Sequence, residues 1–115
     1  MIYKGSCHCG GIAFEAEGDL EQVIQCNCSI CSKRGFLLWF VPIANFRLLT
    51  PLENYATYTF YKHKIKHHFC QKCGCAPFSE DFSSTGAKMA AINTHCLDDV
   101  DLSTLKVRSF DGRKL

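Results

Sequence analysis

The chain has 115 residues, of which 47% are hydrophobic and 12% aromatic, so we predict a single domain over residues 1–115 with a modest core. The formal net charge of +2 argues against charge-driven binding of nucleic acid, and no apolar run approaches the roughly 18 residues of a membrane span. The N-terminal residues lack a signal-peptide pattern, so we expect a cytoplasmic chain that does not enter a membrane.

Short apolar runs separated by turn residues follow one another through the first half of the chain. Residues 12–17 alternate large apolar side chains with small or charged ones, which is typical of a half-buried strand. Residues 36–41 are continuously apolar and end at Pro42, which favours a strand buried on both faces. One helical turn fits residues 29–33. Further short strands are predicted at residues 23–24 and 45–49.

The second half of the chain continues this pattern. Residues 55–61 are rich in β-branched and aromatic side chains, and a hairpin tip at residues 62–64 leads into a strand at residues 65–69 that carries His67. Further strands are predicted at residues 88–93 and 106–110, with one helical turn within 97–105. Many short strands between turn signals predict a mainly β fold with little helix.

The cysteines are numerous and clustered, with nine in the chain. In a reducing compartment clustered thiols stay free of disulfides and are typical of metal sites. The clusters are Cys7/Cys9, Cys26/Cys28/Cys31 and Cys70/Cys73/Cys75, and Cys96 stands alone.

Cys70 and Cys73 form a Cys-x-x-Cys pair followed by glycine, a spacing that lets two thiolates reach one ion. The pair needs two more ligands, and we expect Cys7 and Cys9 to supply them. A redox-active pair would need a helix after the motif, whereas Pro77 follows soon after it. We therefore predict a structural zinc that closes a long loop and adds its binding energy to the stability of the fold.

Cys26, Cys28 and Cys31 place three thiols within six residues. Zinc takes thiolates in a tetrahedron, and three protein ligands leave one position for water or substrate. Spacing alone leaves two alternatives: an open, reactive site, or a closed site with Cys75, Cys96 or a histidine as fourth ligand.

Two cations, Lys33 and Arg34, follow these three cysteines. They form either a solvated charged patch or a site for the carboxylate of an anionic thiol substrate. His67 and His68 lie beside Cys70 and are interpreted as structural histidines rather than metal ligands.

The three cysteine motifs resemble those of the glutathione-dependent formaldehyde-activating enzyme family. They read Cys-His-Cys-Gly-Gly at residues 7–11, Cys-Asn-Cys-Ser-Ile-Cys at 26–31 and Phe-Cys-x-x-Cys-Gly at 69–74. The segments at residues 57–60, 67–70, 95–97 and 110–112 are similar to the centromere protein V-like branch of that family. The resemblance extends from about Tyr3 to Gly112.

This resemblance implies several short, coiled antiparallel sheets around a structural zinc. It implies two Zn²⁺ ions, one structural on Cys7, Cys9, Cys70 and Cys73, and one catalytic on Cys26, Cys28 and Cys31. The implied activity is that of a carbon–sulfur lyase, S-(hydroxymethyl)glutathione synthase, which joins glutathione reversibly to formaldehyde. We therefore predict a zinc enzyme that acts on a small thiol adduct. The alternative is a non-enzymatic zinc module that binds a partner protein.

Overall fold

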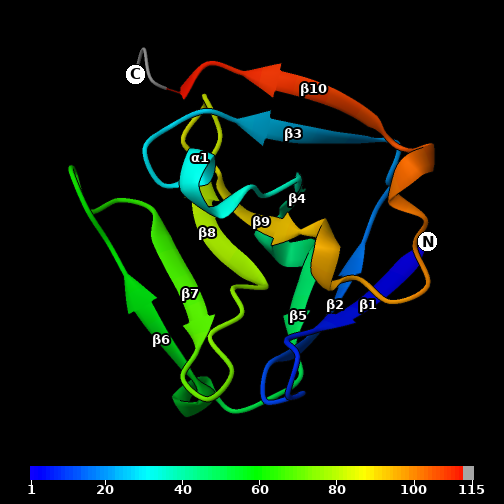
Figure 1. Ribbon diagram of the computed structural model, residues 1–115, viewed down its shortest axis with the longest axis vertical. Coiled ribbons are helices and arrows are strands. Elements are labelled where there is room, and N and C mark those ends of the chain that lie inside the picture. Colours follow the sequence, from blue (N-terminus) through cyan, green and yellow to red (C-terminus); the bar gives the residue numbers. More distant parts are fainter. Residues whose placement is uncertain (113–115) are drawn as a thin grey trace.

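The computed structural model describes residues 1–112, arranged as two β-sheets joined by turns (Figure 1). Residues 113–115, the end of the predicted domain, lie outside the described part of the chain. The strands are β1 (Ile2–Ser6), β2 (Ala13–Glu17), β3 (Gln22–Cys26), β4 (Leu38–Pro42), β5 (Phe46–Leu48), β6 (Tyr55–Tyr58), β7 (Lys66–Cys70), β8 (Phe78–Phe82), β9 (Lys88–Asn93) and β10 (Lys106–Phe110). The described helices are α1 (Cys31–Arg34) and short 3-10 turns at Ile43–Asn45, Leu52–Asn54, Thr94–Cys96 and Leu102–Thr104. None of these helices is long and apolar enough to cross a membrane.

The strands form one small and one large sheet. The small sheet has the order β1-β2-β5, and the large sheet has the order β10-β3-β4-β9-β8-β7-β6. The described strand pairs are antiparallel except for β3 with β10, which run parallel. The prediction of a mainly β fold with little helix is confirmed, although one sheet is larger than expected and includes this parallel pair.

Two strands, β1 and β8, were absent from the sequence prediction, and β6 is shorter than predicted. The middle of β8 reads Ser-Glu-Asp, which hides the apolar alternation of a strand. Strand β6 ends at Tyr58, because the chain then turns through left-handed backbone at Tyr61 and His63.

The hydrophobic core lies between the two sheets. Strand β2 of the small sheet contributes Phe14, and the large sheet contributes alternate residues of its central strands, such as Val41 from β4 and Ile92 from β9. Because side chains of a strand alternate between faces, the intervening residues point to the other side of the large sheet. Phe40 of β4 and Ala91 of β9 line a pocket on that second face.

A buried histidine ties together the outer strands of the large sheet. The Nδ1 atom of His68 lies 2.8 Å from Thr57 Oγ1, and its Nε2 atom lies 2.7 Å from Glu80 Oε2. Glu80 also forms an ion pair with Lys88, at 2.8 Å. Burial lowers the pKa of His68, although the hydrogen bond and charge of Glu80 oppose this shift. Both ring nitrogens therefore have partners, as expected for a structural histidine.

Candidate metal centres

Four cysteine sulfurs from two parts of the chain, about sixty residues apart, meet in one place. The Sγ atoms of Cys7, Cys9, Cys70 and Cys73 all lie within 4.8 Å of one another. Cys9 Sγ is 3.6 Å from Cys7 Sγ and 3.5 Å from Cys70 Sγ. Sulfurs around a tetrahedral zinc, with Zn–S bonds of about 2.3 Å, are separated by about 3.8 Å. The donor set and its spacing therefore fit a zinc ion, and the turn after β1 and the end of β7 position it.

Backbone amides surround the sulfurs of this four-cysteine group. The Ile12 amide donates to Cys7 Sγ at 3.3 Å, and the Cys73 amide donates to Cys70 Sγ at 3.5 Å. A hydrogen bond from the Cys75 backbone amide is the main reason why the pKa of the Cys73 thiol is lowered to about 5. Amide donors favour thiolate over thiol, which is the form that a metal binds.

The second group, which we call the triplet, consists of Cys26, Cys28 and Cys31, whose sulfurs also lie within 4.8 Å of one another. Cys26 ends β3 and Cys31 begins α1, which stops after one turn at Gly35, where the backbone is left-handed with φ +69°. The Cys28 amide donates to Cys26 Sγ at 3.4 Å. Within residues 1–112, no other His, Cys, Asp or Glu joins this group at that distance.

The two remaining cysteines lie elsewhere. Cys75 packs against the cluster that contains Cys7 and Cys70. The Cys96 thiol is 3.6 Å from the side-chain amide of Asn93, and burial raises its pKa to about 11. Neither residue supplies the triplet with the fourth ligand that a closed site would need.

The segment after β10 closes over the triplet. The Asn27 amide donates to the Phe110 carbonyl at 3.2 Å, and the Asn27 side chain donates to Asp111 Oδ1 at 3.0 Å. A Cβ atom on Gly112 would lie 2.7 Å from Cys26 Sγ, so only glycine fits there. The sequence predicted only a turn at Asp111 and Gly112, because no local pattern shows that they pack on cysteines more than eighty residues away.

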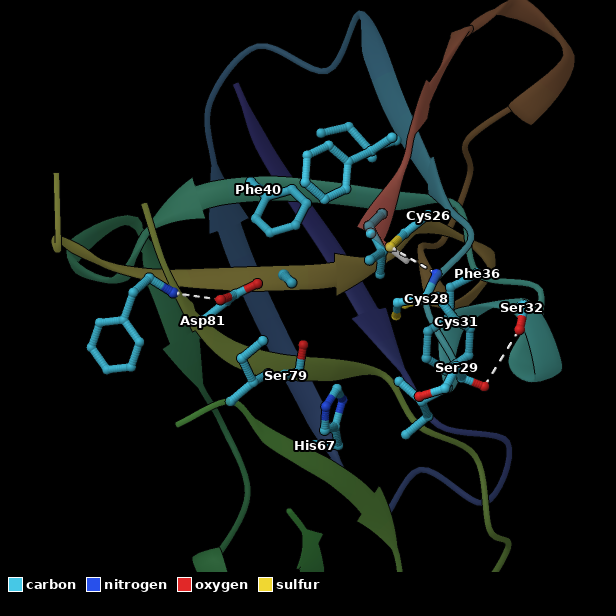
Figure 2. A pocket seen from close by; sticks show the side chains of 18 of the residues that line it. Cys26, Cys28, Ser29, Cys31, Ser32, Phe36, Phe40, His67, Ser79 and Asp81 are labelled. Carbon is cyan, nitrogen blue, oxygen red and sulfur yellow. Dashed lines mark hydrogen bonds between the residues drawn. The ribbon is translucent and has the colours of Figure 1, made fainter. Parts of the chain in front are cut away.

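A cavity of about 1310 Å³ opens beside the triplet, on the second face of the large sheet. Figure 2 shows the three cysteines at one end of this cavity, Asp81 at the other, and His67 and Phe40 on opposite sides. We call this cavity the pocket. Most of its wall is apolar, and strands β3, β4, β7, β8 and β9 contribute alternate residues to it.

A comparison with known families decides the relationship suggested by the three cysteine motifs. The family model described as glutathione-dependent formaldehyde-activating enzyme matches residues 2–110. The chain belongs to this family. The structure is also similar to the crystal structure of a Rhodobacter sphaeroides protein, with a TM-score of 0.78 and 25% sequence identity. That similarity covers 91% of this chain and 99% of the other, so both share one fold over almost their whole length.

In this member of the glutathione-dependent formaldehyde-activating enzyme family, the two cations predicted to bind substrate differ from each other in their position relative to the pocket. Lys33 lines the pocket and is exposed. The guanidinium of Arg34 instead lies 5.5 Å from the ring centroid of Phe36, as in a cation–π contact. The structure therefore brings one of the two cations into the pocket wall.

Two titratable groups that the sequence did not single out as site residues also line the pocket of this family member. His67 is 8% exposed, and its Nε2 atom is buried with no hydrogen-bond partner in the described part of the chain. Burial first, and then the charge of Arg34, lower the pKa of His67 to about 4, so its ring is neutral near pH 7. Burial raises the pKa of Asp81, whose carboxylate accepts the Phe82 amide at 2.6 Å.

Proposed function

We propose that this chain is a zinc-dependent enzyme of the carbon–sulfur lyase type, which joins a small thiol to formaldehyde and reverses that reaction. Family membership supports formaldehyde activation in general. The proposal of a lyase that acts on a thiol is supported by the triplet, a group of three thiols at the end of the pocket. Among the described residues no fourth ligand joins this group. Glutathione is the thiol in the family's name and is the first one to test.

The proposed division of roles follows the two cysteine groups. The structural zinc would be held by Cys7, Cys9, Cys70 and Cys73, and the catalytic zinc by Cys26, Cys28 and Cys31. The first group is surrounded by backbone amides and joins distant parts of the chain, whereas the second borders the pocket. The first arrangement suits a closed site, and the second leaves access for a ligand.

In the forward reaction the thiol sulfur forms a bond to the carbonyl carbon as the C=O π bond breaks, and the thiol proton ends on the oxygen. A zinc ion on three thiolates would carry a net charge of −1 and would favour holding the substrate as a thiolate over polarising the carbonyl. Lys33 would offset negative charge at the pocket, and the apolar wall would limit access of water to the adduct.

Cobalt substitution tests this proposal. A thiolate that binds the metal of the triplet changes the visible bands of Co²⁺, and we expect such a change on adding glutathione or a smaller thiol. Binding should tighten as pH rises toward the free thiol pKa of about 8.5. NMR of ¹³C-formaldehyde would then report the adduct. If no thiol changes the spectrum with both sites loaded, the proposal is wrong, and the alternative of a zinc module that binds a partner protein gains support.

A further inference from the structure

The wall of the pocket is dominated by aromatic and aliphatic side chains. They include Phe40, Phe82, Met89 and Phe110 on strands, and Phe60 and Tyr61 on loops. Several of them are left unusually open to solvent: Tyr61 is 76% exposed, Phe82 47% and Phe110 45%. Exposed apolar side chains gathered around one cavity indicate a site for an apolar ligand.

The charged groups of the pocket do not match glutathione, which carries two carboxylates and an ammonium group. Among the described lining residues the cations are Lys33 and Lys62, both exposed, and Arg34 stands next to the wall, stacked on Phe36 and close enough to lower the pKa of His67. A carboxylate ligand is usually held by a fixed arginine fork or by convergent donors. Asp81, the carboxylate on the wall, would repel a bound carboxylate. The pocket therefore has few groups that would compensate for the loss of hydration of two carboxylates.

One polar atom in the wall lacks a partner. The His67 Nε2 atom is buried and unpartnered among the described residues, although more than nine-tenths of buried polar groups in proteins are hydrogen-bonded. Stacking on Phe60, at 5.5 Å between ring centroids and 23° between planes, holds the His67 ring in place. Figure 2 shows this ring rising from β7 into the pocket. Because Nε2 itself is buried, a ligand in the pocket does not reach it, and His67 contributes its stacked ring to the pocket wall.

We propose that the thiol used by this chain carries an aromatic or branched aliphatic body in place of the charged peptide of glutathione. This inference rests on the proposed function, since it names the class of thiol that the same site takes. The body of the thiol would lie between Phe40, Met89 and Phe82, with its sulfur toward the triplet.

Methionine methyl NMR of the full zinc-loaded chain tests the inference. Met89 lines the pocket, whereas Met1 is 83% exposed and serves as an internal control. Phenylmethanethiol, 2-mercaptoethanol and glutathione are titrated separately in a phosphine reductant. We expect phenylmethanethiol to shift the Met89 signal at a concentration at least tenfold lower than either other thiol, with Met1 unmoved.

One variant and its matched control test where the body of the thiol binds. Phe82→Ala should weaken phenylmethanethiol about tenfold and leave 2-mercaptoethanol unchanged. Leu49→Ala is the matched control, because Leu49 is 50% exposed and lies outside the pocket.

The outcomes distinguish this inference from the proposed function. If glutathione shifts Met89 as readily as phenylmethanethiol and also changes the cobalt spectrum, the proposed function stands and the apolar thiol is wrong. If phenylmethanethiol shifts Met89 without changing the cobalt spectrum, the pocket binds apolar molecules that are not its thiol substrate, which also overturns the inference. If the Met89 signal moves with protein concentration instead, the pocket wall is a contact between copies of the chain.

Discussion

Removing one ligand of the four-cysteine group should cost far more stability than removing one ligand of the triplet. Cys9 and Cys70 are 61 residues apart, so a metal between them closes a long loop of the unfolded chain. We expect the three remaining thiolates of this closed site to release the metal, which loses the closure of that loop, worth about 4 kcal/mol in the chain-entropy description. Cys28 lies within a run of six residues, and closing so short a loop is worth only about 2 kcal/mol in the same description.

Urea unfolding followed by the fluorescence of Trp39 measures both losses. Trp39 is the single tryptophan and is 5% exposed, so its emission reports the core. With a urea m-value of about 2 kcal/mol per M, Cys70→Ser should lower the midpoint by about 2 M and Cys28→Ser by about 1 M. Small domains have about 5–15 kcal/mol of stability, so the first variant should lose a large part of it.

Cys75→Ser provides the control, because Cys75 packs beside the same group without belonging to it. Its midpoint should fall by no more than about 0.5 M. Equal midpoints for Cys70→Ser and Cys28→Ser, in zinc and a phosphine reductant, would refute the division into a structural and an open site. So would a Cys70→Ser midpoint that matches the Cys75→Ser control.

Two further predictions concern the triplet and the pocket. In Gly112→Ala the new Cβ would lie 2.7 Å from Cys26 Sγ and would disturb the triplet. We therefore expect a mild chelator to remove one of two zinc equivalents, that of the triplet, faster than in the wild type. Unchanged release of both equivalents would contradict the packing of Gly112 on the triplet. The pKa of His67 is lowered from 6.5 to about 4, so the unfolded chain binds more protons between these pH values and stability falls as pH falls through them. From pH 7 to pH 5 the free energy of unfolding should therefore drop by about 2 kcal/mol more in the wild type than in His67→Phe. Urea unfolding at each pH measures this difference. If the free energies of unfolding of the two proteins fall in parallel with pH, His67 is not buried as described.

Local patterns in the sequence predicted much of the strand content. The alternation around Phe14 and the apolar run that contains Trp39 correspond to β2 and β4, which provide core-facing side chains. The spacing of Cys26, Cys28 and Cys31 likewise placed three sulfurs in one group, because residues so close in sequence have little freedom to separate.

Features that depend on distant parts of the chain could not be predicted in this way. Strand β8 was missed because its pocket-facing residues, Ser79 and Asp81, are polar and break the apolar alternation. The difference between His67 and His68 depends on Glu80, which reaches one ring and not the other from the neighbouring strand. The packing of Gly112 on the triplet requires the parallel pairing of β10 with β3, for which the sequence carries no local signal.

The long separation within the four-cysteine group also has a consequence for synthesis of the chain. A ribosome that adds about 5–20 residues per second needs about 3–12 s to proceed from Cys9 to Cys70. During those seconds Cys7 and Cys9 are part of a nascent chain whose other two ligands do not yet exist. Zinc can therefore be captured by all four thiols only after Cys73 has been synthesised, and until then the first pair is open to oxidants and to competing soft metals.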